Sequence, residues 1–228
     1  MHFPGFAERV GVVRERVSLA VARGGHGQQV RLIAVTKTQG PEAVTAALEA
    51  GITDIGENKV QEAVGKQEAL GAHAGLRWHL IGHLQSNKVK ALDRFDLLHA
   101  LDRPSLAEAV NAFGVKRGRP VEVLVQVNVS LEETKGGYPL AGLEAEAARL
   151  AAMPGLVVRG VMTMAPLDAE ERVLRRVFAG AREALGTLRT AGHEARELSM
   201  GMSQDYEVAV EEGATMVRLG TVLFGARS

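Results

Sequence analysis

The sequence of 228 residues contains no cysteine, one tryptophan and two tyrosines. The absence of cysteine excludes disulfide bonds, thiolate metal sites and a cysteine nucleophile. Basic and acidic residues number 27 each, so no net field draws the chain toward nucleic acid or an anionic membrane. No apolar run approaches the roughly 20 residues that span a bilayer, and residues 1–6 lack the segments of a signal peptide. We therefore expect a cytoplasmic protein without nucleic-acid or membrane partners.

What the chain does contain is a regular alternation of short branched runs and helical patterns. An amphipathic helix is predicted over residues 6–22, with Val10, Val13, Val17 and Ala20 on its apolar face. The predicted strands follow at residues 32–35, 54–56, 77–81, 97–100, 121–127, 157–162, 197–200 and 216–219. The predicted helices between them are residues 42–50, 60–70, 106–113, 140–152, 169–189 and 205–212, with at best a short helix at 87–92.

Eight strands that alternate with helices, with no linker or break in composition, are typical of a (β/α)8 barrel. The sequence therefore predicts one barrel domain over residues 1–228 with an extra N-terminal helix. A doubly wound open sheet also alternates strands with helices, and it is the alternative fold.

A single lysine stands where the first predicted strand ends. Residues 31–38 are Arg-Leu-Ile-Ala-Val-Thr-Lys-Thr, and Pro41 then suits the first turn of a helix. Desolvation at the mouth of a sheet disfavours an ammonium group and favours the free amine that a Schiff base with an aldehyde requires. Lys37 could equally end the strand and point to water. The residues at the other strand ends are needed to distinguish a reactive amine from a solvent-exposed lysine.

The last two strand ends indicate a phosphate site. Loops after strands 7 and 8 of a barrel often hold phosphate at the C-terminal face. Ser203 is predicted to be the N-cap of the helix over 205–212, where unpaired amides favour an anion. At Gly220-Thr221 an anion can approach the backbone closely, with the threonine hydroxyl next to it. Arg218 should point into the mouth, where it would bind a carboxylate, a phosphate or a ring nitrogen. These groups converge on Lys37, because strands 1 and 8 are neighbours in a closed barrel.

A metal or dinucleotide site is not expected. His79 and His83 have the spacing of helical metal ligands, but they lie on a predicted strand and the loop after it. We therefore predict a structural or pocket-lining role for both histidines. No complete G-x-G-x-x-G or Walker A pattern is present, which disfavours a dinucleotide or ATP.

Several longer motifs stand in order along almost the whole chain. They are Ala34-Val-Thr-Lys37-Thr, Gly56-Glu57-Asn58, Trp78-His79-Leu-Ile81-Gly82 with Leu84-Gln85-Ser-Asn87-Lys88, Ser199-Met-Gly201-Met-Ser203, and residues 216–227. Together they resemble the pyridoxal-phosphate homeostasis family, single-domain proteins similar to the N-terminal barrel of alanine racemase (fold type III).

The resemblance implies a site for pyridoxal 5′-phosphate (PLP). By that likeness Lys37 holds the cofactor as a Schiff base, Ser203, Gly220 and Thr221 receive its phosphate, Arg218 faces the pyridine nitrogen and Asn58 lies beside the ring. Ser199 is a further candidate. Thr134-Lys135-Gly136 stands where the family has a Ser-Lys-like turn.

Arg218 limits the chemistry that this site could perform. A charged guanidinium disfavours a protonated pyridine nitrogen, and a neutral ring is a poor electron sink. Racemases of this fold add a tyrosine from a second domain, whereas this sequence ends soon after its eighth strand and has Tyr138 and Tyr206 away from the predicted strand ends. We expect a monomeric, non-enzymatic protein that buffers PLP and delivers it to apo-enzymes. A small PLP-dependent racemase or lyase that uses Lys37 as its base is the alternative.

Overall fold

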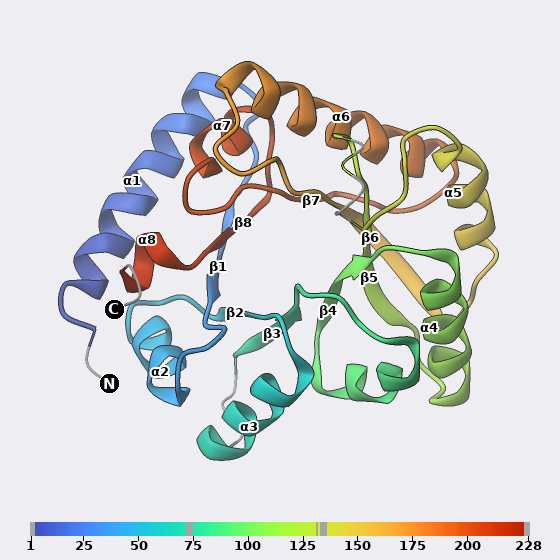
Figure 1. The fold of residues 1–228 in the computed structure, drawn as a ribbon, viewed down its shortest axis with the longest axis horizontal. Helices are drawn as coiled ribbons and strands as arrows, with labels where there is room; N and C mark the ends of the chain where they lie inside the picture. Colours follow the sequence, from blue (N-terminus) through green and yellow to red (C-terminus); the bar gives the residue numbers. More distant parts are fainter. Residues whose placement is uncertain (1–2, 72–74, 131, 133–135, 226–228) are drawn as a thin grey trace.

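Eight parallel strands form a closed barrel, with the helices around its outside (Figure 1). The computed structural model describes residues 3–71, 75–130, 132 and 136–225. The strands pair in chain order, and Ile33 on the first strand pairs with Arg218 on the last. The predicted (β/α)8 barrel is confirmed. The open doubly wound sheet is wrong, because closure leaves no strand at an edge.

The strands are β1 Arg31–Val35, β2 Asp54–Glu57, β3 Arg77–Leu80, β4 Leu97–Leu101, β5 Val121–Gln126, β6 Leu156–Met162, β7 Glu197–Ser199 and β8 Met216–Leu219. The helices are α1 Phe6–Gly24, α2 Pro41–Glu49, α3 Val60–Leu70, α4 Pro104–Lys116, α5 Leu143–Ala151, α6 Glu171–Thr190, α7 Tyr206–Glu211 and α8 Thr221–Phe224. The 3-10 helix η1, Ser86–Arg94, lies between β3 and β4.

Every predicted strand is present to within one residue at either end. Strands buried on both faces produce nearly continuous apolar runs, which makes them easy to locate in a sequence. The segment predicted as a short helix at 87–92 is the longer 3-10 helix η1, and α8 was not predicted, because four residues are too few to show a helical period.

Helix α1 covers one side of the barrel, where it packs against α7 and α8 (Figure 1). All four of its predicted apolar positions are buried, and so is Phe6. The Phe6 ring lies 4.9 Å from that of Phe224 between centroids, and Arg9 donates a hydrogen bond to the Leu223 carbonyl at 2.6 Å. The added helix therefore holds α8 in place at the C-terminal end of β8.

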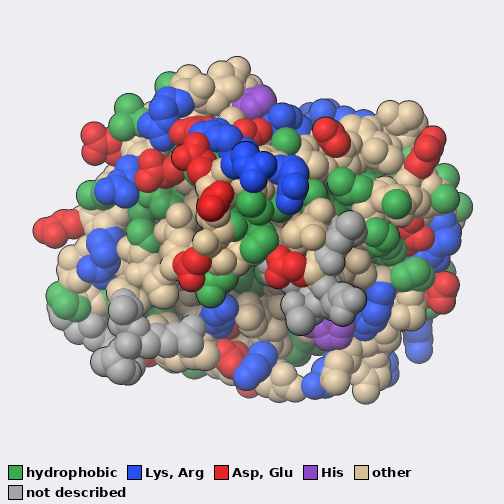
Figure 2. All heavy atoms as spheres, turned by 45° about the horizontal axis from the view of Figure 1, so that its top comes forward, with side chains coloured by type: hydrophobic (Ala, Val, Ile, Leu, Met, Phe, Trp, Pro, Cys, Tyr) green, Lys and Arg blue, Asp and Glu red, His purple; other side chains and the backbone are tan. Residues whose placement is uncertain are grey.

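Basic and acidic side chains are interspersed over the helices of the outer surface (Figure 2). Arg175 on α6, for example, pairs with Glu171 on its own helix and with Glu211 and Glu212 at the end of α7. Within the described ranges, no helix combines the length and the apolar character needed to cross a bilayer.

Candidate functional site

A cavity of about 950 Å³ opens at the C-terminal ends of the strands. Its lining contains all six residues that the sequence singled out, which are Lys37, Asn58, Ser203, Arg218, Gly220 and Thr221. They come from the loops after β1, β2 and β7 and from the end of β8 with the start of α8. Closure of the barrel brings these distant segments to one place, as the sequence predicted.

Lys37 lies in a tight turn between β1 and α2, half-buried in the cavity lining. The next residue, Thr38, has a φ of 63°, a left-handed conformation that is unusual for a β-branched side chain. Its amide donates to Glu62 Oε2 of α3 at 2.9 Å. That hydrogen bond is the largest cause of the lowered pKa of the Glu62 carboxyl. Helix α3 thus holds a strained turn that presents Lys37 to the cavity.

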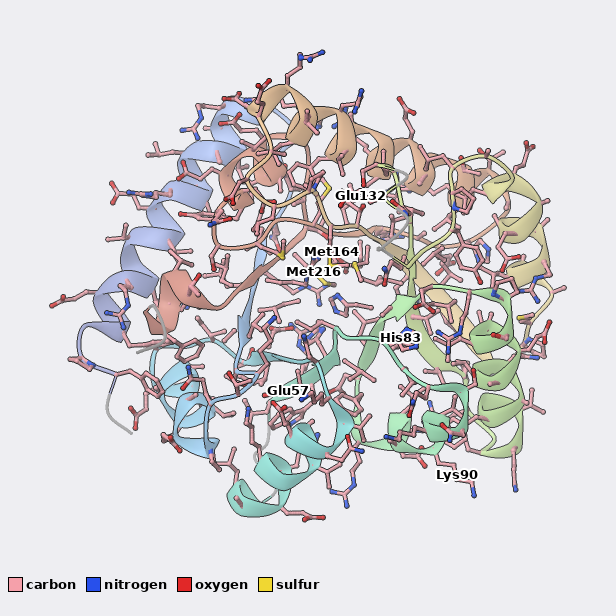
Figure 3. All side chains as sticks on the ribbon, viewed as in Figure 1. Glu57, His83, Lys90, Glu132, Met164 and Met216 are labelled. Atoms are coloured by element: carbon pink, nitrogen blue, oxygen red, sulfur yellow. The ribbon has the colours of Figure 1, made fainter. Side chains whose placement is uncertain are left out.

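A buried ion pair, which sequence reasoning missed, supports the residue before Lys37. Lys66 Nζ donates to the Thr36 carbonyl at 2.6 Å and also to Glu57 Oε1, which accepts the Thr36 hydroxyl as well. Glu57 is fully buried on β2 (Figure 3), and Lys66 is 5% exposed. Burial raises the pKa of the Glu57 carboxyl, although its hydrogen bonds with Lys66 and Thr36 act in the opposite direction. The pair anchors the backbone from which Lys37 projects.

Ser203 lines the cavity, but it does not cap α7. The helix begins at Tyr206, and Asp205 flanks it with a carboxylate that accepts the Met202 amide at 2.5 Å. The predicted N-cap role of Ser203 is therefore wrong, because the chain makes a turn over Met202–Asp205 before the helix starts. Ser203 Oγ instead accepts the amides of Gly220 at 3.2 Å and Val222 at 3.3 Å. These two convergent amides are donors of the kind that phosphate accepts.

Arg218 points into the barrel mouth, as predicted, and is 5% exposed. Its guanidinium donates to Ser199 Oγ at 2.7 Å and to the Thr163 carbonyl at 2.9 Å. Burial lowers the pKa of Arg218 to about 10, an effect that Asp205 partly opposes, so the group remains a cation at neutral pH. Ser199 itself is fully buried and does not line the cavity. It is connected to the cavity by its hydrogen bond with Arg218.

The two histidines lie in different surroundings. His79 is buried in the barrel, where it contacts Asp54 and His99, whereas His83 lines the cavity and is held by Asp102 at 2.8 Å (Figure 3). Both positions match the predicted structural and pocket-lining roles. Among the residues that the structure describes, no group of three or more His, Cys, Asp or Glu could hold a metal ion.

Tyr138 and Tyr206 are buried outside the cavity lining, and burial raises the pKa of both phenols. Gly136 lines the cavity, whereas Thr134, Lys135 and the end of the last motif at residues 226–227 lie outside the described residues.

Comparisons with known proteins identify the family of this chain. The family model described as alanine racemase, N-terminal domain, matches residues 13–228. A pyridoxal phosphate homeostasis protein of Aquifex aeolicus is 41% identical over 223 residues, which are 96% of this chain and 97% of that protein.

Solved structures extend the comparison. PipY of Synechococcus elongatus, solved without and with PLP, is 38% identical with TM-scores of 0.87 and 0.85, and the match covers 96% of this chain and 100% of PipY. Alanine racemase of Corynebacterium glutamicum is 19% identical and shares the fold alone, with a TM-score of 0.72 over 93% of this chain and 60% of that enzyme. The chain therefore belongs to the family of alanine racemase N-terminal domains and, within it, to the pyridoxal phosphate homeostasis proteins.

Proposed function

We propose that this chain binds PLP reversibly through Lys37 and serves vitamin B6 homeostasis by buffering and delivering the cofactor. The observation that carries the proposal is the convergence of the Lys37 amine, the Arg218 guanidinium and the Ser203–Gly220 pair on one cavity. The relatives named for PLP homeostasis and the PLP-bound PipY structure support it.

The chemistry of the donors fits the cofactor. The Lys37 amine suits an aldehyde, and the amides of Gly220 and Val222 with the hydroxyls of Ser203 and Thr221 suit a phosphate. Arg218 suits an unprotonated ring nitrogen, to which a guanidinium can donate. When bound, PLP supplies an aldehyde that links covalently to amines and a ring that withdraws electrons. Asn58 would lie beside that ring, between β2 and α3.

We infer that the chain, acting as one domain and as a monomer in the cytoplasm, binds and releases PLP without turnover. The Arg218 cation disfavours protonation of the ring nitrogen and so weakens the ring as an electron sink. Neither Tyr138 nor Tyr206 lines the cavity, so neither can act as the opposing acid–base group that a tyrosine supplies in racemases of this fold. The alternative function, a small racemase or lyase, would draw on Lys37 and on His83, which Asp102 orients within the same cavity.

Transfer and turnover can be separated in one experiment. We expect PLP-loaded protein to restore activity to an apo-enzyme that uses PLP, and to convert no amino acid when L-alanine and other amino acids are followed by chiral chromatography. Free PLP at the same concentration is the control for both readings. Turnover above that control, lost on substitution of Lys37, would instead establish an enzyme.

Gly82 offers a test of the Asn58 side of the cavity. A Cβ at Gly82 would lie 2.3 Å from the Asn58 carbonyl oxygen, so Gly82→Ala must displace the loop that carries Asn58. We expect the Kd for PLP, measured by absorption titration, to rise about tenfold through loss of roughly one hydrogen bond. Gly65→Ala on α3 is the matched control, because nothing lies within 4 Å of the added Cβ. Equal affinities for the two variants would show that Asn58 does not contact the cofactor.

A further inference from the structure

A continuous chain of buried hydrogen bonds runs from Arg218 through the barrel interior to the opposite end. Ser199 Oγ accepts from Arg218 at 2.7 Å and lies 2.9 Å from His99 Nδ1. His99 Nε2 lies 2.9 Å from His79 Nδ1, and His79 Nε2 lies 2.9 Å from Asp54 Oδ1. We call Asp54, His79, His99, Ser199 and Arg218 the interior chain.

The interior chain crosses the barrel and does not follow its wall. His99 lies on β4 and Ser199 on β7, and these strands are not neighbours in the sheet. Asp54 is the first residue of β2, so the interior chain begins at the N-terminal end of the strands and ends at the cavity. Each member is at most 5% exposed, which keeps water from competing for these bonds.

Asp54 at one end of the interior chain and Arg218 at the other determine which atom donates in each hydrogen bond between them. Burial alone would raise the pKa of Asp54, but hydrogen bonds from His79 and Arg77 outweigh it and lower that pKa, so the carboxylate is ionised and only accepts. His79 must therefore carry hydrogen on Nε2. His99 is neutral, because burial in the barrel interior lowers its pKa well below the usual value.

With His99 neutral, one assignment of hydrogens gives every member of the interior chain a partner for each of these bonds. His79 Nδ1 accepts from His99 Nε2–H, and His99 Nδ1 accepts the Ser199 hydroxyl. Ser199 then uses its oxygen to accept from Arg218. In the opposite assignment Ser199 Oγ would accept from both Arg218 and His99, and its hydroxyl hydrogen would have no acceptor among the hydrogen bonds described for Ser199.

We propose that Ser199, His99, His79 and Asp54 are positioning residues of the cofactor site, which orient Arg218 and stabilise its charge toward the ring nitrogen of PLP. The proposal rests on the proposed function. The carboxylate of Asp54 polarises each bond in turn, so its effect reaches the guanidinium across the barrel.

Asp54→Asn should reverse this polarity without changing the shape of the side chain. Arg77 donates to Asp54 Oδ2 at 2.8 Å, so the amide oxygen of the variant must face Arg77 and its NH2 must face His79. His79 Nε2 then accepts and both rings change tautomer. Ser199 Oγ accepts from both His99 and Arg218, and its hydroxyl loses the acceptor that His99 Nδ1 supplied.

The test uses full-length protein loaded with PLP that is 15N-labelled at the ring nitrogen. In Asp54→Asn we expect the ring nitrogen resonance to move toward that of a protonated pyridinium and the Kd for PLP to rise about three- to tenfold. Asp96→Asn is the matched control. Asp96 precedes β4 at the same end of the barrel, and its carboxylate accepts the Trp78 amide at 2.7 Å outside the interior chain.

Arg218→Glu removes the guanidinium, so its ring nitrogen resonance defines the largest shift with which that of Asp54→Asn is compared. An unmoved resonance in Asp54→Asn, or an equal shift in Asp96→Asn, would overturn the inference. If wild-type protein forms no borohydride-fixed adduct on Lys37, the proposed function fails instead.

A second measurement does not depend on how the variants fold. In wild-type protein labelled with 15N-histidine and loaded with PLP, we expect His79 and His99 to be neutral Nε2–H tautomers. An imidazolium, or an Nδ1–H tautomer, at either position would contradict the assignment.

Discussion

Lys37→Ala is expected to abolish the covalent adduct with PLP while the barrel remains folded. Lys37 is the only lysine among the described residues that line the cavity, so no neighbouring amine can replace it there. The measurement is borohydride reduction of the PLP-loaded protein followed by mass mapping of the modified residue. Bleaching of the visible absorption should accompany the modification in wild-type protein and be absent from the variant.

Lys59→Ala is the control for this experiment. Lys59 lies just before α3, its side chain is 70% exposed, and it pairs with Glu62 at 3.5 Å. Both substitutions remove half-buried or exposed groups, so the free energy of unfolding should change by no more than about 0.5 kcal/mol. A phosphopyridoxyl group that remains in Lys37→Ala would show that the cofactor is held by another amine.

Lys66→Met is expected to lower the free energy of unfolding by about 3–5 kcal/mol, the cost of leaving a buried charge without its partner. Glu57 is fully buried and would keep only the Thr36 hydroxyl among the hydrogen bonds described for its carboxylate. Urea unfolding of the variant and of the Lys59→Met control measures the difference.

The stability deficit of Lys66→Met, which is its loss in free energy of unfolding relative to wild type, should depend on pH. Burial already raises the pKa of Glu57, and loss of Lys66 removes a group that lowers it. A carboxyl with a raised pKa in the folded state binds more protons than in the unfolded state, so stability falls as pH rises through that window. The deficit is therefore expected to shrink as pH falls from mildly alkaline to mildly acidic.

A double variant separates the charge from the packing. Glu57→Gln combined with Lys66→Met removes both charges at nearly constant volume, and it should recover part of the stability lost in Lys66→Met. A deficit that is independent of pH and unchanged in the double variant would show that Lys66 contributes through its methylene packing alone.

The amino-acid sequence was sufficient for the architecture and for the main members of the candidate site. The eight strands were located because each is a short apolar run, and parallel strands place all their C-terminal ends at one face. Lys37, Ser203, Arg218, Gly220 and Thr221 were found because each lies at or just after the end of such a run, whereas Asn58, just after β2, was added by the resemblance to a known family. The signal in every case is local, within a few residues of a strand boundary.

Other features depended on the folded chain. The sequence indicated Ser203 as a helix cap, whereas its hydroxyl accepts amides 17 and 19 residues later in the chain. Glu57 and Lys66, and the histidines of the interior chain, were not predicted as partners. A buried histidine on an apolar strand carries no local sign of what it will contact.

What the sequence determined by itself is therefore the order of elements, the closure into a barrel and the residues at the barrel mouth, because these follow from periodicity and strand ends. Only the tertiary structure decided which polar groups meet inside the barrel. His99 and Ser199 are 100 residues apart and lie on strands that do not pair, so their contact depends on closure, on strand register and on the side chains packed between the strands. No pattern along the chain encodes that distance.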